Sequence, residues 1–188
     1  MSASEIPTTL ENSMKKYLVL TALGADRPGL IRDVAKAVQE IGCGIADCRM
    51  TVLGSEFTLL LLASGNWNAI AKLESQAASL GKKLDLAITT RRTEERAPRA
   101  MLPYVVDVAT LDRPGMLSDI ADFFARHDIN IEEMSGWAYA AASTGAEMVS
   151  VSLNISVPAD THVGRLRDEF TDFCDGLNLD ATLEPARR

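Results

Sequence analysis

The chain has 188 residues, of which 47% are hydrophobic and 24% are charged, a composition typical of a globular protein with a substantial core. No apolar run reaches the ~18 residues of a membrane-spanning helix, and residues 1–16 lack the basic and apolar regions of a secretory signal. Three cysteines do not suggest a disulfide framework, so we expect a cytoplasmic protein without contact to a membrane.

The net charge of −7 is concentrated in the second half of the chain. Residues 100–188 carry six Arg and fifteen Asp or Glu, whereas residues 1–90 carry nine basic and nine acidic residues. Proteins that bind nucleic acid place clustered Lys and Arg opposite the phosphates. Neither half has such a cluster, so we expect no direct contact with nucleic acid. The acidic half could instead attract a basic protein partner.

An internal repeat relates the two halves at an offset of 86 residues. Residues 23–30 align with residues 109–116, and both segments contain Asp-Arg-Pro-Gly. Further matches keep the same register: Val19 with Val105, Asp33 with Asp119, Ala35 with Ala121 and Ile45 with Ile131. Because the agreement extends well beyond the shared motif, we predict two copies of one structural module.

The first copy predicts strands and helices from its apolar periodicity. The helix that follows the first strand has Leu30, Val34, Val38 and Ile41 at helical spacing. The expected elements are a strand at 17–23, a helix at 28–42, two strands at 45–53 and 56–63 joined by a hairpin at Gly54-Ser55, a helix at 67–80 ending at Gly81, and a strand at 84–88.

A charged segment separates the copies. Residues 91–99 contain four Arg, two Glu and one Pro without apolar periodicity, so we place a linker at 93–100, between modules at 15–92 and 101–186. The second module repeats the order with a strand at 102–110, a helix at 114–127, strands at 129–140 and 146–157, a helix at 160–175 and a strand at 177–183. Its hairpin connection, at 140–145, is longer than the first one.

The order βαββαβ predicts an α+β fold of two tandem ferredoxin-like domains, each with an antiparallel sheet and both helices on one face. A module of this size leaves the other face of its sheet uncovered. Pairing between copies, edge to edge or across chains, would bury that surface. We therefore expect a homo-oligomer such as a dimer.

The Asp-Arg-Pro-Gly corner, where the first strand of each module meets the first helix, is the candidate binding site. Proline suits the first turn of a helix, and Asp26 and Asp112 are placed to cap it. Gly29 and Gly115 have no side chain, so the first-turn amides could accept the carboxylate of an amino acid. Its ammonium would face Asp or the carbonyls of the neighbouring strand. The same residues equally suit a strand-to-helix turn that binds nothing, and the sequence alone leaves both possibilities open.

These residues resemble a known ligand-binding regulatory module, the ACT domain. A hydrophobic strand is followed by Gly-Ala-Asp-Arg-Pro-Gly at 24–29 and then by Ile45 on the second strand. The longer segments 17–29, 50–58 and 64–70 are similar to the glycine cleavage system transcriptional repressor family, whose members consist of two ACT domains. The resemblance covers residues 15 to 185 and implies the tandem ACT fold.

The resemblance also implies a function. Such a protein would sense an amino acid, with glycine suspected, and would act by contact with a transcriptional activator of glycine cleavage genes rather than with DNA. Glycine would relieve the repression. The alternative is an ACT-type regulatory subunit of an amino-acid or one-carbon metabolic enzyme. The resemblance implies neither a cofactor nor enzymatic activity of the chain itself.

By the same resemblance, the ligand site comprises each corner and the start of the second strand. Its residues are Ala25, Asp26, Arg27, Pro28, Gly29, Leu30, Gly44 and Ile45 in the first copy, and Leu111, Asp112, Arg113, Pro114, Gly115, Met116, Asn130 and Ile131 in the second. Many ACT domains have Asn before this Ile, as the second copy does. Because the first copy has Gly44 instead, we expect the ligand to prefer the second corner or an interface built from both. Arg27 and Arg113 are expected to be exposed.

Other reactive side chains do not form a catalytic or metal-binding set. Cys43 and Cys48 are five residues apart without a CxxC motif, and Cys174 is expected in the core. His127 is expected at a helix end as a half-buried or capping residue, and His162 is expected to be exposed. The two histidines lie in separate elements without a nearby nucleophile, so we predict no catalytic residue and no metal site.

Overall fold

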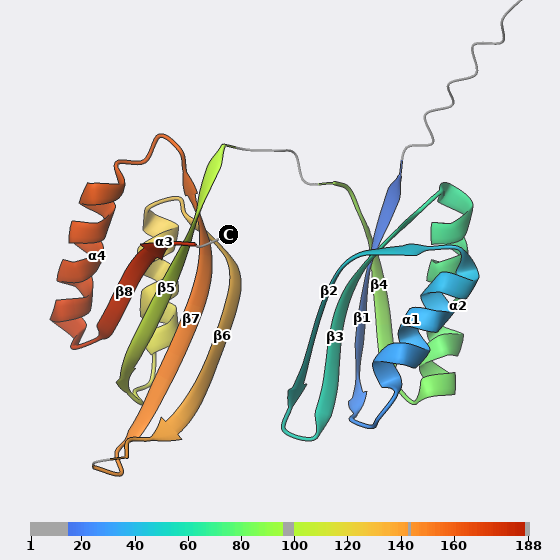
Figure 1. Cartoon of the computed structure of the whole chain (residues 1–188), viewed down its shortest axis with the longest axis horizontal. Helices are drawn as coiled ribbons and strands as arrows, with labels where there is room; N and C mark the ends of the chain where they lie inside the picture. The colour runs from blue at the N-terminus through green and yellow to red at the C-terminus, as the bar shows by residue number, and fades with distance from the viewer. Residues whose placement is uncertain (1–14, 96–99, 143, 187–188) are drawn as a thin grey trace, which may run out of the picture. The chain divides into compact units, whose positions relative to one another are not determined.

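The computed structural model describes residues 15–95, 100–142 and 144–186. The chain forms two compact units, one in each half, and each is a four-stranded antiparallel sheet with two helices on one face (Figure 1). This confirms the predicted fold of two ferredoxin-like βαββαβ modules. Most of the N-terminal segment and part of the predicted linker lie outside the described residues, so the module boundaries stay a prediction.

The first unit has the strand order β2-β3-β1-β4, with β1 in the interior of the sheet. All strand pairs described here are antiparallel. The elements are β1 (Lys16–Ala25), α1 (Leu30–Ile41), β2 (Gly44–Leu53), β3 (Glu56–Gly65), α2 (Trp67–Leu84) and β4 (Ala87–Thr93).

The second unit repeats this topology with the order β6-β7-β5-β8. Its edge strand β6 carries an irregularity between Ile131 and Glu133, which matches the one between Ile45 and Asp47 in β2. The elements are β5 (Met101–Leu111), α3 (Met116–Arg126), β6 (Asn130–Ala140), β7 (Glu147–Pro158), α4 (Val163–Leu177) and β8 (Asp180–Pro185).

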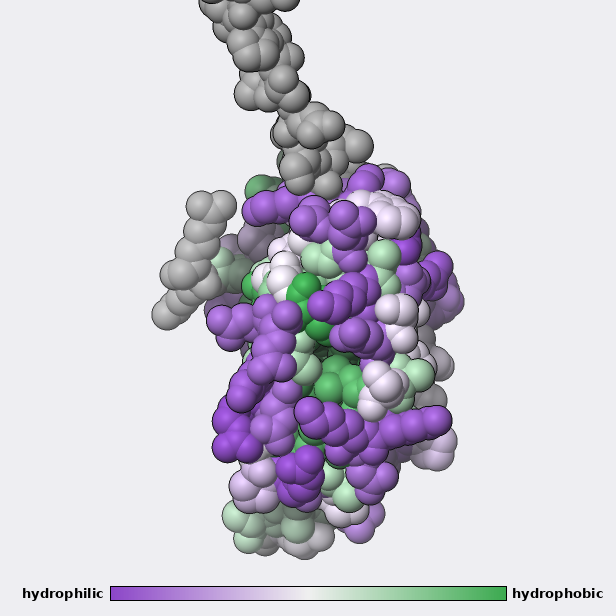
Figure 2. Space-filling view, turned by 90° about the vertical axis from the view of Figure 1, so that its right-hand side faces the viewer, coloured by the Kyte–Doolittle hydropathy of each residue, from purple (hydrophilic) through white to green (hydrophobic). Residues whose placement is uncertain are grey.

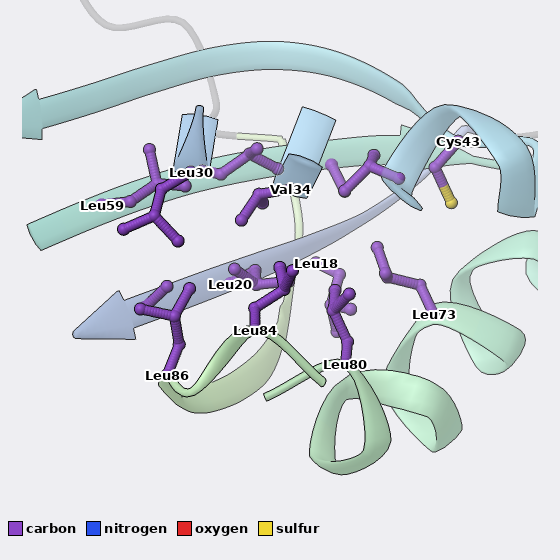
Figure 3. Close-up of a cluster of buried hydrophobic side chains, with 14 of the residues drawn as sticks. Leu18, Leu20, Leu30, Val34, Cys43, Leu59, Leu73, Leu80, Leu84 and Leu86 are labelled. Atoms are coloured by element: carbon purple, nitrogen blue, oxygen red, sulfur yellow. The ribbon is translucent and has the colours of Figure 1, made fainter. Parts of the chain in front are cut away.

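The core of the first unit lies between the sheet and its helices, as Figure 3 shows. Alternate residues of β1, such as Leu18 and Leu20, are fully buried, because successive side chains of a strand point to opposite faces. Leu30 and Val34 of α1 and Leu73 of α2 meet them from the helices. The second unit has a separate core, in which phenylalanines of α3 and α4 pack together.

Helix α2 ends later than its sequence predicts. The prediction took Gly81 as the helix end, but α2 continues to Leu84 and closes at Asp85 in a left-handed conformation. Gly81 has a different role: a Cβ at this position would lie 2.6 Å from the carbonyl oxygen of Leu86. The glycine therefore allows the chain after α2 to pass close to the helix.

The last strand of the first unit also differs from the prediction. Strand β4 occupies 87–93 rather than 84–88, so the first part of the charged segment belongs to the sheet. The guanidinium of Arg92 donates two hydrogen bonds to a carboxylate oxygen of Glu74 on α2 and lies over the ring of Trp67. These contacts explain how a charged segment can be an ordered strand.

Helices α1 and α2 present a polar outer surface. A shallow hollow of about 380 Å³ between them has an apolar floor that includes Ile41 and Leu80 and a rim with lysines of α2. Figure 2 shows this side of the first unit, with hydrophilic side chains over most of it and hydrophobic ones visible between them. None of the helices in the described part of the chain is long and apolar enough to cross a membrane.

Candidate functional site

Both Asp-Arg-Pro-Gly corners form the same tight turn before a helix. Helix α1 begins at Leu30 rather than at the predicted Pro28, and α3 begins at Met116. Gly29 and Gly115 occupy the N-cap position with φ of 93° and 88°, a left-handed conformation that favours glycine. The motif's glycine is therefore required by the turn itself.

The predicted capping by Asp26 and Asp112 is wrong. The N-cap glycines provide no side-chain hydrogen bond to the helix, and the aspartates lie three residues before them, beyond the Pro-Gly turn. The aspartate amides instead tie the corner to the neighbouring hairpin. The amide of Asp26 donates to the carbonyl of Ser55 at 2.9 Å, and the amide of Asp112 donates to that of Glu147 at 3.0 Å.

The arginine of each corner turns back to an aspartate in the first turn of the helix. Arg113 Nη2 donates to Asp119 Oδ2 at 2.8 Å, and Arg27 Nη1 lies 3.6 Å from Asp33 Oδ2. Arg27 is exposed as predicted, whereas Arg113 is half-buried. The Nε atom of Arg113 is buried and has no hydrogen-bond partner among the described residues. The second corner therefore holds a cation with an unused donor.

An open pocket of about 730 Å³ adjoins the second corner, within the volume range of small-molecule sites. The corner, the first turn of α3 and strands β6 and β7 form its walls. The lining residues are Asp112, Arg113, Gly115, Met116, Leu117, Ser118, Met134, Gly136, Trp137, Ala138, Val149 and Val151. Its polar groups come from the corner and the first turn, and the strands contribute apolar ones.

Few side-chain atoms project into this pocket from β6, because β6 has small residues there. Gly136 pairs with Val151, and Ala138 pairs with Val149, in the antiparallel register of β6 and β7. Val151 is buried and faces the helices, so Gly136 and Ala138 are on the same face. Neither has a side chain long enough to reach toward α3.

The first corner has the same Asp-Arg-Pro-Gly turn but differs at positions beside it. At the offset of 86 residues, Met50 and Val52 replace Gly136 and Ala138, and Arg32 replaces Ser118. The Arg32 guanidinium covers Gly29: a Cβ on this glycine would lie 3.0 Å from Arg32 Nη2. A Cβ on Gly115 would meet no atom within 4 Å. The two corners share their backbone turn but differ in the space beside it.

The start of the second strand does not complete either corner within one module. Asn130 pairs with Ser156, which pairs with Pro103, eight residues before the end of β5 at Leu111. At ~3.3 Å per residue this separation is about 26 Å. The Asn130 side chain instead donates to Glu132 at 2.9 Å.

Some of the predicted site residues line the pocket at the second corner, and the others lie outside it. In the second module four of them line the pocket, namely Asp112, Arg113, Gly115 and Met116, while Leu111, Pro114, Asn130 and Ile131 do not. In the first module Leu30 is a core residue, whereas Ala25, Asp26 and Pro28 are exposed. Gly44 and Ile45 lie at the opposite end of the sheet from the corner. Four of the predicted residues therefore lie together at the pocket of the second corner, and ligand binding at either corner stays a prediction.

The pocket also contains residues that sequence reasoning missed. These are Leu117 and Ser118 on α3, Met134, Gly136, Trp137 and Ala138 on β6, and Val149 and Val151 on β7. The repeat alignment contains a signal for two of them, because a glycine and an alanine replace Met50 and Val52 on the aligned strand.

Neither the cysteines nor the histidines form a reactive set. Burial, aided by the charge of Asp175, raises the pKa of the Cys174 thiol to about 11, so the unreactive thiol form persists at neutral pH. His127 ends α3, and His162 caps α4 by accepting from the amide of Arg165. Among the described residues there is no group of three or more His, Cys, Asp or Glu that could hold a metal ion.

Comparison with known proteins gives consistent results. The ACT domain model matches residues 16–91. The glycine cleavage system transcriptional repressor of Escherichia coli (strain K12) is 35% identical over 173 residues, which are 91% of this chain and 90% of that protein. A crystal structure of a proposed repressor of the same kind has a TM-score of 0.73 at 29% identity and covers 94% of this chain and 100% of its own.

A further solved structure supports the fold alone. It is a protein of unknown function from Galdieria sulphuraria, with a TM-score of 0.75 at 21% identity. The match covers 92% of this chain and 99% of that chain, so the tandem arrangement of two modules is common to both.

Proposed function

This chain belongs to the glycine cleavage system transcriptional repressor family, and on that premise we propose that it is an amino-acid sensor that regulates gene expression through contact with another protein. The proposal that the chain senses an amino acid rests on the pocket at the second corner. There, first-turn amides and Arg113 can take a carboxylate while Asp112 can take an ammonium. An α-amino acid has both groups on one carbon.

The regulatory partner is proposed to be a transcriptional activator of glycine cleavage genes. The net charge of −7 disfavours direct contact with nucleic acid phosphates and favours a basic protein surface. The ligand would shift the chain between a partner-binding and a released form, which requires that the two forms bind the ligand with different affinities. No catalytic step is part of this proposal.

We also propose that the chain forms a homo-oligomer, most simply a dimer. Every residue of the edge strand β2 is exposed, and its apolar residues include Met50, Val52 and Leu53. An unpaired edge of this kind presents free backbone N–H and C=O groups with which a strand of another chain can pair. Light scattering coupled to size exclusion should give at least twice the mass of the chain, and the mass of a single chain at micromolar concentration would refute the dimer.

Isothermal titration with glycine and a panel of other amino acids tests the sensor. The matched variants are Arg113→Gln, at the pocket, and Arg27→Gln, at the equivalent position of the first corner. Loss of one charge-assisted contact should weaken binding about tenfold or more in the first variant only. Absence of heat with every amino acid would reject the sensor, and equal loss in both variants would reject the second corner as its site.

Purification of the tagged chain from its own host, with and without amino acid in the buffer, tests the partner. A transcriptional activator that is retained in one condition and released in the other is the expected result. Recovery of a metabolic enzyme instead would favour the alternative, a regulatory subunit of an amino-acid or one-carbon enzyme. The ACT domain in this chain is compatible with both functions.

A further inference from the structure

A groove of about 360 Å³ lies between helices α3 and α4 of the second module, and residues of these two helices alone line it. We infer that this groove docks a basic amphipathic helix of the protein that the chain regulates. The inference rests on the proposed regulation by protein contact and deepens it, because it names the surface that makes the contact.

The floor of the groove is apolar. Phe123 of α3 lines it together with Phe173 and Leu177 of α4, and the two residues of α4 are partly exposed. The ring centroids of Phe123 and Phe173 lie 4.9 Å apart, so the helices meet there through bulky side chains. Helix α3 has 11 residues and is about 16 Å long. An amphipathic helix of three turns matches this length and can place its apolar side chains on the floor.

The rim of the groove is acidic. Asp119 and Asp122 line it from α3, and Asp172 lines it from α4. The first two pair with Arg113 and Arg126, whereas Asp172 makes no ion pair with any described residue. Together α3 and α4 contain six Asp or Glu and three Arg. A helix with Lys or Arg beside its apolar face is therefore attracted to this surface, and an acidic helix is repelled.

A glycine lines the same groove without a packing role inside the module. Gly176 lies within α4, where glycine is a poor helix former. It is exposed, and a Cβ at this position would meet no atom within 4 Å. The packing of the described residues thus does not require a glycine here. Its missing side chain does leave room for another helix to approach α4 closely.

The first module has a similar hollow with a rim of the opposite charge. The hollow of about 380 Å³ between α1 and α2 has Lys72 and Lys83 at its edge. Helices α1 and α2 together contain five Lys or Arg and three Asp or Glu, so a basic helix is not attracted there. The helices α1 and α2 of a second copy have the complementary charge for the groove, but they are themselves hollowed and would leave it unfilled. We therefore assign the groove to a single helix of another protein.

Fluorescence anisotropy with a labelled synthetic peptide tests the inference on the full chain. The peptide has about 14 residues, with leucines at helical spacing and lysines beside them. Its matched control has a glutamate in place of each lysine. The lysine peptide should bind at least about tenfold more tightly, and added salt should weaken its binding. Equal binding of the two peptides, or no binding of the lysine peptide, would overturn the inference.

Two variants locate the binding of the lysine peptide. Asp172→Lys replaces an attraction at the rim with a repulsion and should weaken binding about fivefold. Gly176→Leu fills the groove and should weaken binding at least about tenfold without lowering Tm, because leucine is the better helix former. The control is Glu40→Lys, at the edge of the hollow in the first module, which changes the net charge as much as Asp172→Lys does. Equal losses in Glu40→Lys and Asp172→Lys would contradict binding at the groove.

Purification of the tagged chain from its host separates this inference from the proposed function. The parent chain should retain a transcriptional activator that Gly176→Leu does not retain. Retention by both would place the contact elsewhere and overturn the inference, while regulation by protein contact stands. Retention of no activator by the parent chain would count against the proposed function itself. Dissociation of an oligomer by Gly176→Leu, seen by light scattering, would assign the groove to a second copy and also overturn the inference.

Discussion

His127 ends α3 and connects it to α4 through one of its two ring nitrogens, Nε2. Nδ1 lies 2.8 Å from the carbonyl oxygen of Phe123, and Nε2 lies 2.7 Å from Glu169 Oε2. Both neighbours are acceptors, so a protonated imidazolium can donate to each of them. Arg165 Nε is a further partner of Glu169, at 3.0 Å. The residue that the sequence placed at a helix end, as half-buried or capping, is thus also a link between two helices.

This link predicts a dependence of stability on pH. The hydrogen bond from His127 lowers the pKa of the Glu169 carboxyl, burial opposes this with a smaller effect, and the charge of Arg165 lowers the pKa further. An unfolded Glu has a pKa of about 4.3, so the stabilisation is fully present above that value and is lost as the pH falls through the lower value of the folded protein. Glu169→Gln should therefore destabilise the second module at pH 6 and much less at pH 3.

Urea unfolding at these two pH values measures the effect. The control is Asp168→Asn, which removes an exposed carboxylate from the neighbouring position of α4. The control should show a smaller difference between the two pH values than Glu169→Gln. The same destabilisation by Glu169→Gln at pH 3 and pH 6 would contradict an ion-pair origin.

At the scale of single elements, Gly81 of α2 and Gly176 of α4 have opposite surroundings. Gly81 faces the backbone of Leu86, and its carbonyl accepts the Leu86 amide at 2.9 Å. Gly176, in the last turns of α4, is exposed, and a Cβ there would meet no atom within 4 Å. Helix propensity alone would rank both positions as weak points.

The two positions should therefore respond oppositely to alanine. Gly176→Ala should stabilise the protein by up to about 1 kcal/mol, since alanine is the better helix former and nothing opposes its methyl group. Gly81→Ala should destabilise it by about 1–3 kcal/mol, because the added methyl group would overlap a backbone carbonyl. Thermal unfolding of both variants checks this pair. An increase in Tm for Gly81→Ala would show that the chain after α2 can shift at little cost.

At the scale of the whole molecule, the chain is two modules with separate cores and unequal surfaces. The core of the first is centred on leucines and Phe57, and that of the second contains the phenylalanines of α3 and α4. The second module has both the acidic surplus and the pocket. We therefore propose that the two modules differ in function and that the second one binds the ligand.

Separate cores predict that damage to one module leaves the other folded. Phe57 is fully buried, so Phe57→Ala should destabilise the first module by about 3–5 kcal/mol. Hydrogen exchange should rise in the elements of that module, while exchange in the second module stays as in the parent chain. A rise of hydrogen exchange in both modules would mean that the two cores are energetically coupled.

The sequence by itself determined the repeat, the order of elements in each module and the Asp-Arg-Pro-Gly turn. These features depend on neighbours within a few positions of the chain: the buried alternation around Leu18 and Leu20, the helical spacing of Leu30 and Val34, and the positive φ that Gly29 needs. Such local preferences act in the same way wherever the segment lies. They could therefore be read without the fold.

Only the tertiary structure decided what the corner adjoins. It placed Asn130 at the far end of the sheet, and it set Gly136 and Ala138 opposite the first turn of α3. It also gave Gly81 its role beside Leu86. Each of these facts depends on the register between strands or on the approach of segments distant in sequence, and a one-residue change of register would turn every side chain of a strand to the other face. The space beside the corner is thus a property of the packed module.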